Sequence, residues 1–197
     1  MTNFIASPYY LLVKDITYLL ITLGGVVIAC MGLSTWRRQL KGNVEHETAR
    51  RLYKAVLKLR DAMGCVRNPM IWPSEFTEAE AKYPKENKET TNAIYLARWE
   101  KIIEALSGLQ VEQLEGEVLW GEEVIEKLKP MKECVKKLQL TISNLLSPAE
   151  LRKPFKDISE VAYENITDKE ADLFSQEINA AIVVISDFLR PKYNFPK

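Results

Sequence analysis

The chain has 197 residues, and its 27 lysines and arginines balance its 27 aspartates and glutamates. Nucleic-acid binding needs clustered positive charge on a basic domain, so this neutral balance argues against a nucleic-acid partner. The three cysteines, Cys30, Cys65 and Cys134, lie far apart and form no CxxC pair. They therefore indicate neither a zinc ribbon nor a disulfide scaffold, and they fit a reducing compartment.

The most informative segment is residues 16–36, whose sequence ITYLLITLGGVVIACMGLSTW contains no charged residue. About twenty apolar residues in a helix cross the hydrocarbon layer of a bilayer, so the segment is predicted to be a transmembrane helix. The preceding arm lacks net positive charge, and basic residues follow the apolar core, which argues against a cleaved secretory signal. Cys30 loosely matches a lipoprotein signal, but the apolar run continues past it to Leu33.

Basic residues follow the apolar segment at once, at Arg37, Arg38 and Lys41, whereas Lys14 precedes it. By the positive-inside rule, this asymmetry places the C-terminal side in the cytoplasm and the N-terminus outside. Residues 37–60 carry eight basic and two acidic residues. We interpret this stretch as membrane-flanking charge and a solvated helix face, with contact to anionic lipid as the alternative.

Small residues recur along one face of the apolar segment, at Thr22, Gly25, Ala29 and Gly32. The spacing between Gly25 and Ala29 is the small-xxx-small pattern that lets two helix backbones approach closely. This face is therefore a candidate helix–helix contact in the membrane, with a second copy or another protein. A chance pattern of small residues is the alternative.

The first helix after the membrane is predicted from a regular a/d seam that ends before Asn68-Pro69. The seam consists of Ala49, Leu52, Val56, Leu59, Met63 and Val66. Residues 68–91 are predicted to be a loop. Its apolar tip, Met70-Ile71-Trp72, either folds back onto the helices or is exposed to a partner.

The apolar pattern of residues 93–146 would make a single helix of roughly 80 Å, so we expect the chain to fold back within it. Pro130 is the preferred point of reversal. The seam Gly121, Ile125, Leu128 and Met131 slips in phase there, and Gly108 is the milder alternative. A capping sequence at 167–170 is expected to open the last helix, and Pro191 is expected to end it.

These patterns predict an all-α fold with a single N-terminal transmembrane helix followed by an antiparallel bundle of about four helices. The expected segments are a short N-terminal arm (1–15), the transmembrane helix (16–36), a basic juxtamembrane region with the first bundle helix (37–67), a loop (68–91), the remaining bundle helices (92–190) and a C-terminal tail (191–197). The arrangement resembles small single-span bacterial membrane proteins, which implies a bacterial inner membrane. It carries no motif that names a family.

No catalytic, cofactor-binding or metal-ligating residue is predicted. The single histidine, His46, has no Glu-x-x-His or HExxH context, which excludes standard di-iron and zincin sites. No P-loop, GxGxxG or GxSxG motif occurs. The glutamates between 112 and 126 are interpreted as a helix surface, and burial of Glu115 or Glu122 beside a cavity would instead favour an enzyme.

We therefore expect a membrane-anchored, non-enzymatic helical protein that acts as an interaction or accessory subunit, or as a scaffold, on the cytoplasmic face of a membrane. Membrane lipid and either a protein partner or a second copy are the expected partners, and no cofactor is expected. The alternative is an oligomeric membrane-active effector that forms a pore or perturbs the bilayer.

Overall fold

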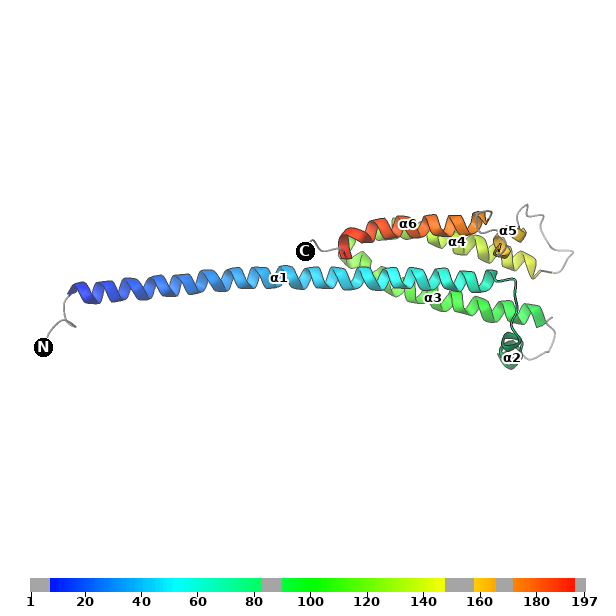
Figure 1. The fold of residues 1–197 in the computed structure, drawn as a ribbon, viewed down its shortest axis with the longest axis horizontal. Coiled ribbons are helices and arrows are strands. Elements are labelled where there is room, and N and C mark those ends of the chain that lie inside the picture. The colour runs from blue at the N-terminus through cyan, green and yellow to red at the C-terminus, as the bar shows by residue number, and fades with distance from the viewer. Residues whose placement is uncertain (1–7, 83–89, 148–157, 166–171, 194–197) are drawn as a thin grey trace. The chain divides into compact units, whose positions relative to one another are not determined.

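The computed structural model describes residues 8–82, 90–147, 158–165 and 172–193 (Figure 1). All regular secondary structure in these ranges is helical, as predicted. The helices are α1 (Pro8–Arg67), α2 (Pro73–Lys82), α3 (Thr90–Trp120), α4 (Glu123–Leu145), α5 (Ile158–Ala162) and α6 (Leu173–Tyr193). The chain separates into two compact units, Met1–Val44 and Glu45–Lys197, and α1 contributes to both.

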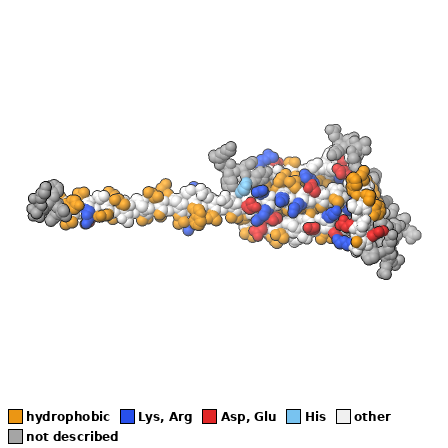
Figure 2. Space-filling view, turned by 60° about the horizontal axis from the view of Figure 1, so that its bottom comes forward, with side chains coloured by type: hydrophobic (Ala, Val, Ile, Leu, Met, Phe, Trp, Pro, Cys, Tyr) orange, Lys and Arg blue, Asp and Glu red, His pale blue; other side chains and the backbone are white. Residues whose placement is uncertain are grey.

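The N-terminal unit consists of the first part of α1. This helix begins at Pro8, before the predicted span, so residues 8–15 of the predicted N-terminal arm are helical; residues 1–7 lie outside the described ranges. Proline suits the first turn of a helix because its missing N–H would have no partner there. Every side chain from Tyr9 to Lys41 is exposed. Hydrophobic side chains predominate over this unit, with few charged ones among them (Figure 2).

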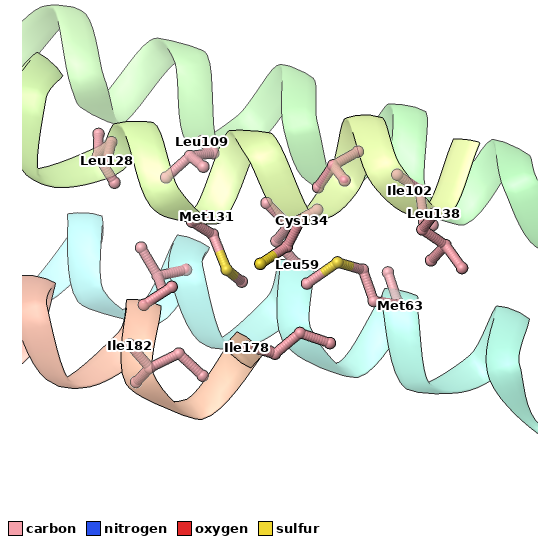
Figure 3. Close-up of a cluster of buried hydrophobic side chains, with 14 of the residues drawn as sticks. Leu59, Met63, Ile102, Leu109, Leu128, Met131, Cys134, Leu138, Ile178 and Ile182 are labelled. Carbon is pink, nitrogen blue, oxygen red and sulfur yellow. The ribbon is translucent and has the colours of Figure 1, made fainter. Parts of the chain in front are cut away.

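The second unit is organised around one hydrophobic core. Every member of the predicted α1 seam is fully buried, which confirms the sequence pattern: Ala49, Leu52, Val56, Leu59, Met63 and Val66. These side chains pack in a single cluster with residues of α3, α4, α5 and α6. Figure 3 shows how the labelled side chains of α1, α3, α4 and α6 converge on this core.

The chain reverses between α3 and α4 at Gly121, and the prediction of a break at Pro130 or Gly108 is wrong. α3 continues through Gly108, and α4 continues through Pro130. Gly121 has a φ of 69°, in the left-handed region that glycine adopts without a Cβ penalty. Its N–H donates to the carbonyl of Glu117 at 2.8 Å, which closes the last turn of α3.

The phase slip that favoured Pro130 came from placing Ile125 on the seam. Val124 is the buried residue, at 1% exposure, whereas Ile125 is only partly buried. From Val124 the core face of α4 continues without interruption through Leu128, Met131, Val135, Leu138 and Ile142. Because buried contacts flank Pro130 on both sides, the helix persists despite the lost backbone N–H.

The predicted loop over 68–91 contains α2, so this prediction needs correction. Pro73 occupies the first helical position. The carboxylate of Glu75 accepts a hydrogen bond from the N–H of Trp72 at 2.9 Å, and this is half of a capping box. Ala79 of α2 is buried against Ala93 and Ile94. Residues 83–89 lie outside the described ranges.

The last helix, α6, buries the predicted face. Its members that the structure describes are Phe174, Ile178, Ile182, Ile185 and Leu189. Asp172 caps the helix by accepting a hydrogen bond from the N–H of Ser175 at 2.9 Å. The predicted cap at 167–170 lies outside the described residues. α6 runs through Pro191 to Tyr193 instead of ending at the proline, so the first three residues of the predicted tail, 191–193, are helical.

Candidate interaction surface

A groove of about 770 Å³ lies between the second part of α1 and α3. We call it the α1–α3 groove. Small residues of both helices line it: Ala55 and Ala62 from α1, and Ala105 and Gly108 from α3. Because small side chains allow a third helix to approach its neighbours closely, this groove has the geometry of a helix-docking site.

The rim of the α1–α3 groove carries charges of both signs, four basic residues and three acidic ones: Arg51, Lys54, Lys58, Lys101, Asp61, Glu104 and Glu112. Lys54 and Lys58 have no ion-pair partner among the residues that the structure describes. The Nζ atom of Lys101 lies 3.9 Å from Cys65 Sγ. At one end Arg51 Nε is paired with Glu112 Oε2 at 3.1 Å, so these two charges offset each other.

The side of α3 that faces away from the core exposes an apolar stripe, which we call the α3 stripe. It consists of Ile103, Val111, Leu114 and Val118. Leu114 is 57% and Val118 is 85% exposed. Two exposed glutamates lie at helical spacing from Val111, Glu104 seven residues before and Glu115 four residues after, and Glu104 also lines the α1–α3 groove. Over one face of the second unit, hydrophobic side chains lie among charged ones of both signs (Figure 2).

The predicted partner loop, Met70-Ile71-Trp72, is partly packed and partly exposed. Ile71 packs against the small cluster of Ala79, Ala93 and Ile94. Met70 and Trp72 are exposed. The tip therefore folds back in part, and two of its three apolar side chains remain open to solvent.

The predicted membrane residues all lie in the N-terminal unit. Thr22, Gly25, Ala29 and Gly32 are exposed along α1, and a Cβ built at Gly25 or Gly32 meets nothing within 4 Å. Arg37, Arg38 and Lys41 follow them and are also exposed. By length and composition, α1 can cross a membrane. The helix–helix contact at the small residues stays a prediction.

Two buried arginines were missed by the sequence reasoning. Arg67, at the end of α1, is 2% exposed and forms a buried ion pair with Asp172, which is also 2% exposed. It also donates to Ser175 Oγ at 2.7 Å. Its remaining acceptors are the backbone carbonyls of Glu160, Val161 and Tyr163. This guanidinium thus ties α1 to α5 and to the start of α6.

Arg98 of α3 holds the segment that leads into α2. It forms a bidentate pair with Glu75, at 2.7 Å and 2.8 Å, and donates to the carbonyls of Asn68 and Met70. The hydrogen bond from Arg98 holds the pKa of Glu75 below its usual value of 4.5. A sequence signal existed for both arginines: Arg98 lies between Tyr95 and Ile102 at helical spacing, and Arg67 lies four residues after Met63.

The two glutamates whose burial would have favoured an enzyme, Glu115 and Glu122, are both exposed. No cluster of three histidine, cysteine, aspartate or glutamate side chains in the described ranges could hold a metal ion. Every buried side-chain nitrogen and oxygen that the structure describes has a hydrogen-bond partner, as is usual for buried polar groups.

Comparisons of the chain with protein-family models, with curated proteins and with solved structures find no match. The functional argument therefore rests on the geometry of the chain itself. Two surfaces carry this argument: the exposed apolar first part of α1, and the α1–α3 groove with the neighbouring α3 stripe.

Proposed function

We propose that this chain is a membrane-anchored, non-enzymatic protein that acts as an interaction subunit or scaffold. Residues 16–36 of α1 would span the membrane. The second unit would form an antiparallel helical bundle on the cytoplasmic side, the side that Arg37, Arg38 and Lys41 favour. The general architecture suits the inner membrane of a bacterium.

The observation that carries the proposal is the contrast between the two parts of α1. The first part exposes large apolar side chains such as Leu19 and Ile28, whereas the second part buries its whole seam in the core. Removing one large apolar side chain from water is worth about 1.5–3 kcal/mol. A long helix surface of this kind is therefore stable in lipid and costly in water.

The α1–α3 groove supports the interaction part of the proposal. It combines a floor of small residues with lysines that lack ion-pair partners among the described residues. An amphipathic helix docks in such a groove by its apolar face and takes its orientation from the charged rim.

The alternative, an oligomeric effector that forms a pore, has less support. A water-filled path needs free polar groups along the span. The hydroxyls of Thr17, Thr22, Ser34 and Thr35 each donate to a backbone carbonyl of their own helix. These donors are therefore already used within α1.

Membrane fractionation of the full chain tests the anchor. The wild-type protein should remain in the membrane pellet after extraction with alkaline carbonate. A variant with Leu20→Arg and Ile28→Arg should lose this retention, because arginine at the centre of a span costs about 2.5–3.5 kcal/mol per residue on insertion scales. A matched variant with Leu140→Arg and Val183→Arg, both exposed in the second unit, should stay in the pellet. Release of the wild-type chain by carbonate would contradict the proposal.

The interaction part is tested on the protein purified from membranes in mild detergent. We expect the particle mass to exceed that of one chain, through either a second copy or a stoichiometric protein partner. A monomer that carries no partner would contradict the role of interaction subunit.

A further inference from the structure

We infer that Arg37 and Arg38 of α1 bind the phosphate groups of anionic lipids, in the leaflet in which the predicted span ends. This inference rests on the proposed function, since it takes the membrane anchor as given, and it names the class of lipid that the anchor recognises. It concerns the N-terminal unit alone, to which both arginines belong.

The length of the span brings both arginines to the lipid headgroups. Residues 16–36 extend about 31 Å as a helix, which matches a hydrocarbon layer of about 30 Å. The headgroup layer on each side is about 5–7 Å thick, and Arg37 and Arg38 follow the end of the span by no more than about 3 Å. Trp36, which precedes them, is exposed on α1, and tryptophan is enriched at membrane–water interfaces. The two guanidinium groups are therefore at the depth of lipid phosphates.

Both arginines are available for such a contact. Each is exposed, and neither has an ion-pair or hydrogen-bond partner among the residues that the structure describes. A guanidinium group presents parallel N–H donors that match two oxygens of one phosphate, and its charge strengthens both hydrogen bonds. A lipid phosphate at this depth would satisfy donors that no described residue of the chain satisfies.

No acidic side chain close to the two arginines offsets their charge. Between Asp15 and Glu45 the chain contains no aspartate or glutamate. Glu45 follows Arg38 by seven residues, about 10 Å along a helix, which exceeds the Debye length of about 8 Å at physiological salt. Lys41 precedes Glu45 by four residues, a spacing at which the two charges can offset each other, so the inference is built on the arginines alone.

The opposite end of the span carries no such excess of charge. Lys14 is followed at once by Asp15, and no other charged side chain occurs in residues 1–15. The Nζ atom of Lys14 also lies 5.9 Å from the centre of the Tyr18 ring. The preference for anionic lipid is therefore expected in one leaflet only, the one that surrounds Arg37 and Arg38.

The test measures lipid association with the full chain, reconstituted in vesicles of phosphatidylcholine. A trace of spin-labelled phosphatidylglycerol or phosphatidylcholine is added, and the motionally restricted part of its EPR spectrum reports the lipid that contacts the protein. Both probes contain a phosphate and two acyl chains, but only phosphatidylglycerol carries a net charge. We expect phosphatidylglycerol to associate about twofold or more strongly at low salt. This difference should shrink at about 1 M salt, where the Debye length is about 3 Å.

Three double variants assign the preference to the two arginines. Arg37→Gln with Arg38→Gln should remove most of it, because glutamine favours a helix about as well as arginine but carries no charge. Arg37→Lys with Arg38→Lys keeps both charges and should retain the preference. The matched control is Arg50→Gln with Lys54→Gln, which removes two exposed charges from the second unit and should leave the preference unchanged.

Two results overturn the inference. One is equal association of the two lipid probes with the wild-type chain, and the other is an equal loss of preference in the control variant. If carbonate washing leaves the wild-type chain in the vesicles in either case, the proposed anchor stands without the lipid preference. Release of the wild-type chain by carbonate contradicts the anchor itself, and the inference with it.

Discussion

Arg67 and Asp172 are separated by 105 residues in the sequence and form a buried ion pair, with Arg67 Nη2 2.8 Å from Asp172 Oδ1. The guanidinium carbon also lies 4.9 Å from the centre of the Phe174 ring. Asp172 in turn accepts hydrogen bonds from the N–H and the hydroxyl of Ser175. The pair therefore fixes the end of α1 against the first turn of α6.

Replacing Arg67 with methionine should destabilise the second unit by about 3–5 kcal/mol, because Asp172 would be left as an unpaired buried charge. Arg60→Met is the matched control, since its pair with Asp61 is exposed. We expect that change to cost no more than about 1 kcal/mol. Urea unfolding of the full chain in mild detergent, followed by circular dichroism, measures both. Equal losses of unfolding free energy for the two variants would show that the buried pair stabilises the second unit no more than the exposed pair does.

The same pair predicts how stability depends on pH. Burial by itself would raise the pKa of Asp172, but hydrogen bonds from Arg67, Ser175 and Asn165 outweigh it and hold the pKa below its usual 3.8. An acid whose pKa is lower in the folded state stabilises that state above the unfolded pKa. This stabilisation is lost as the pH falls through the pKa that Asp172 has in the folded state.

We therefore expect the stability advantage of wild type over Asp172→Asn to be complete above about pH 5 and to shrink below about pH 4. Melting curves of both proteins between pH 7 and about pH 3 test this, and a constant difference would contradict it.

The sequence predicted those helices in which apolar residues recur at helical spacing. The a/d seam of α1 and the apolar face of α6 both lie in the core as expected, because a helix must turn such a face toward its neighbours. α2 was missed because proline is common in loops and also at the first position of a helix, and the sequence alone did not distinguish these two roles for Pro73. Gly121 was missed because it fits the heptad spacing, and its role depends on a positive φ that spacing does not report.

The surface was harder to predict than the core. Ile102 and Ile103 are adjacent in the sequence and chemically identical, yet Ile102 is fully buried and Ile103 is exposed as part of the α3 stripe. The groove depends on which small residues of α1 and α3 face each other, and neither helix alone contains that information. Arg67 and Arg98 were missed because arginine is usually solvated, although both are in phase with buried apolar residues.

Substitution of Gly121 by alanine should destabilise the turn between α3 and α4 by about 1–2 kcal/mol, the cost of a left-handed conformation for a residue with a Cβ. Apart from its own chain neighbours, nothing lies within 4 Å of the added Cβ, so backbone strain is the expected cause of the loss. The same change at Gly108, inside α3, should instead stabilise the helix by about 0.5–1 kcal/mol. Urea midpoints of the two variants should therefore move in opposite directions, and a shift in the same direction would contradict the assignment of the reversal to Gly121.

Truncation of Leu59 to alanine should cost about 2–5 kcal/mol, because this side chain is fully buried between several helices. Leu140→Ala makes the same chemical change on the exposed side of α4 and should stay within about 0.5 kcal/mol of wild type. Thermal unfolding of the full chain in mild detergent distinguishes the two. A small effect at Leu59 would mean that the shared core of the second unit is not formed in solution.

The three cysteines lie in three different parts of the chain. Cys30 is exposed on the apolar part of α1, Cys65 lines the α1–α3 groove, and Cys134 is buried in the core. Burial raises the pKa of the Cys134 thiol, so this group stays protonated and unreactive at neutral pH until the unit unfolds.

In single-cysteine variants within intact membranes, a charged maleimide should therefore leave Cys134 unmodified. It should also leave Cys30 unmodified, but for a different reason: lipid would surround an otherwise exposed thiol. A lipophilic maleimide, or the charged reagent after transfer into detergent-free denaturant, should then modify Cys30. Rapid reaction of Cys30 with the charged reagent in intact membranes would place residue 30 in water and contradict a transmembrane α1.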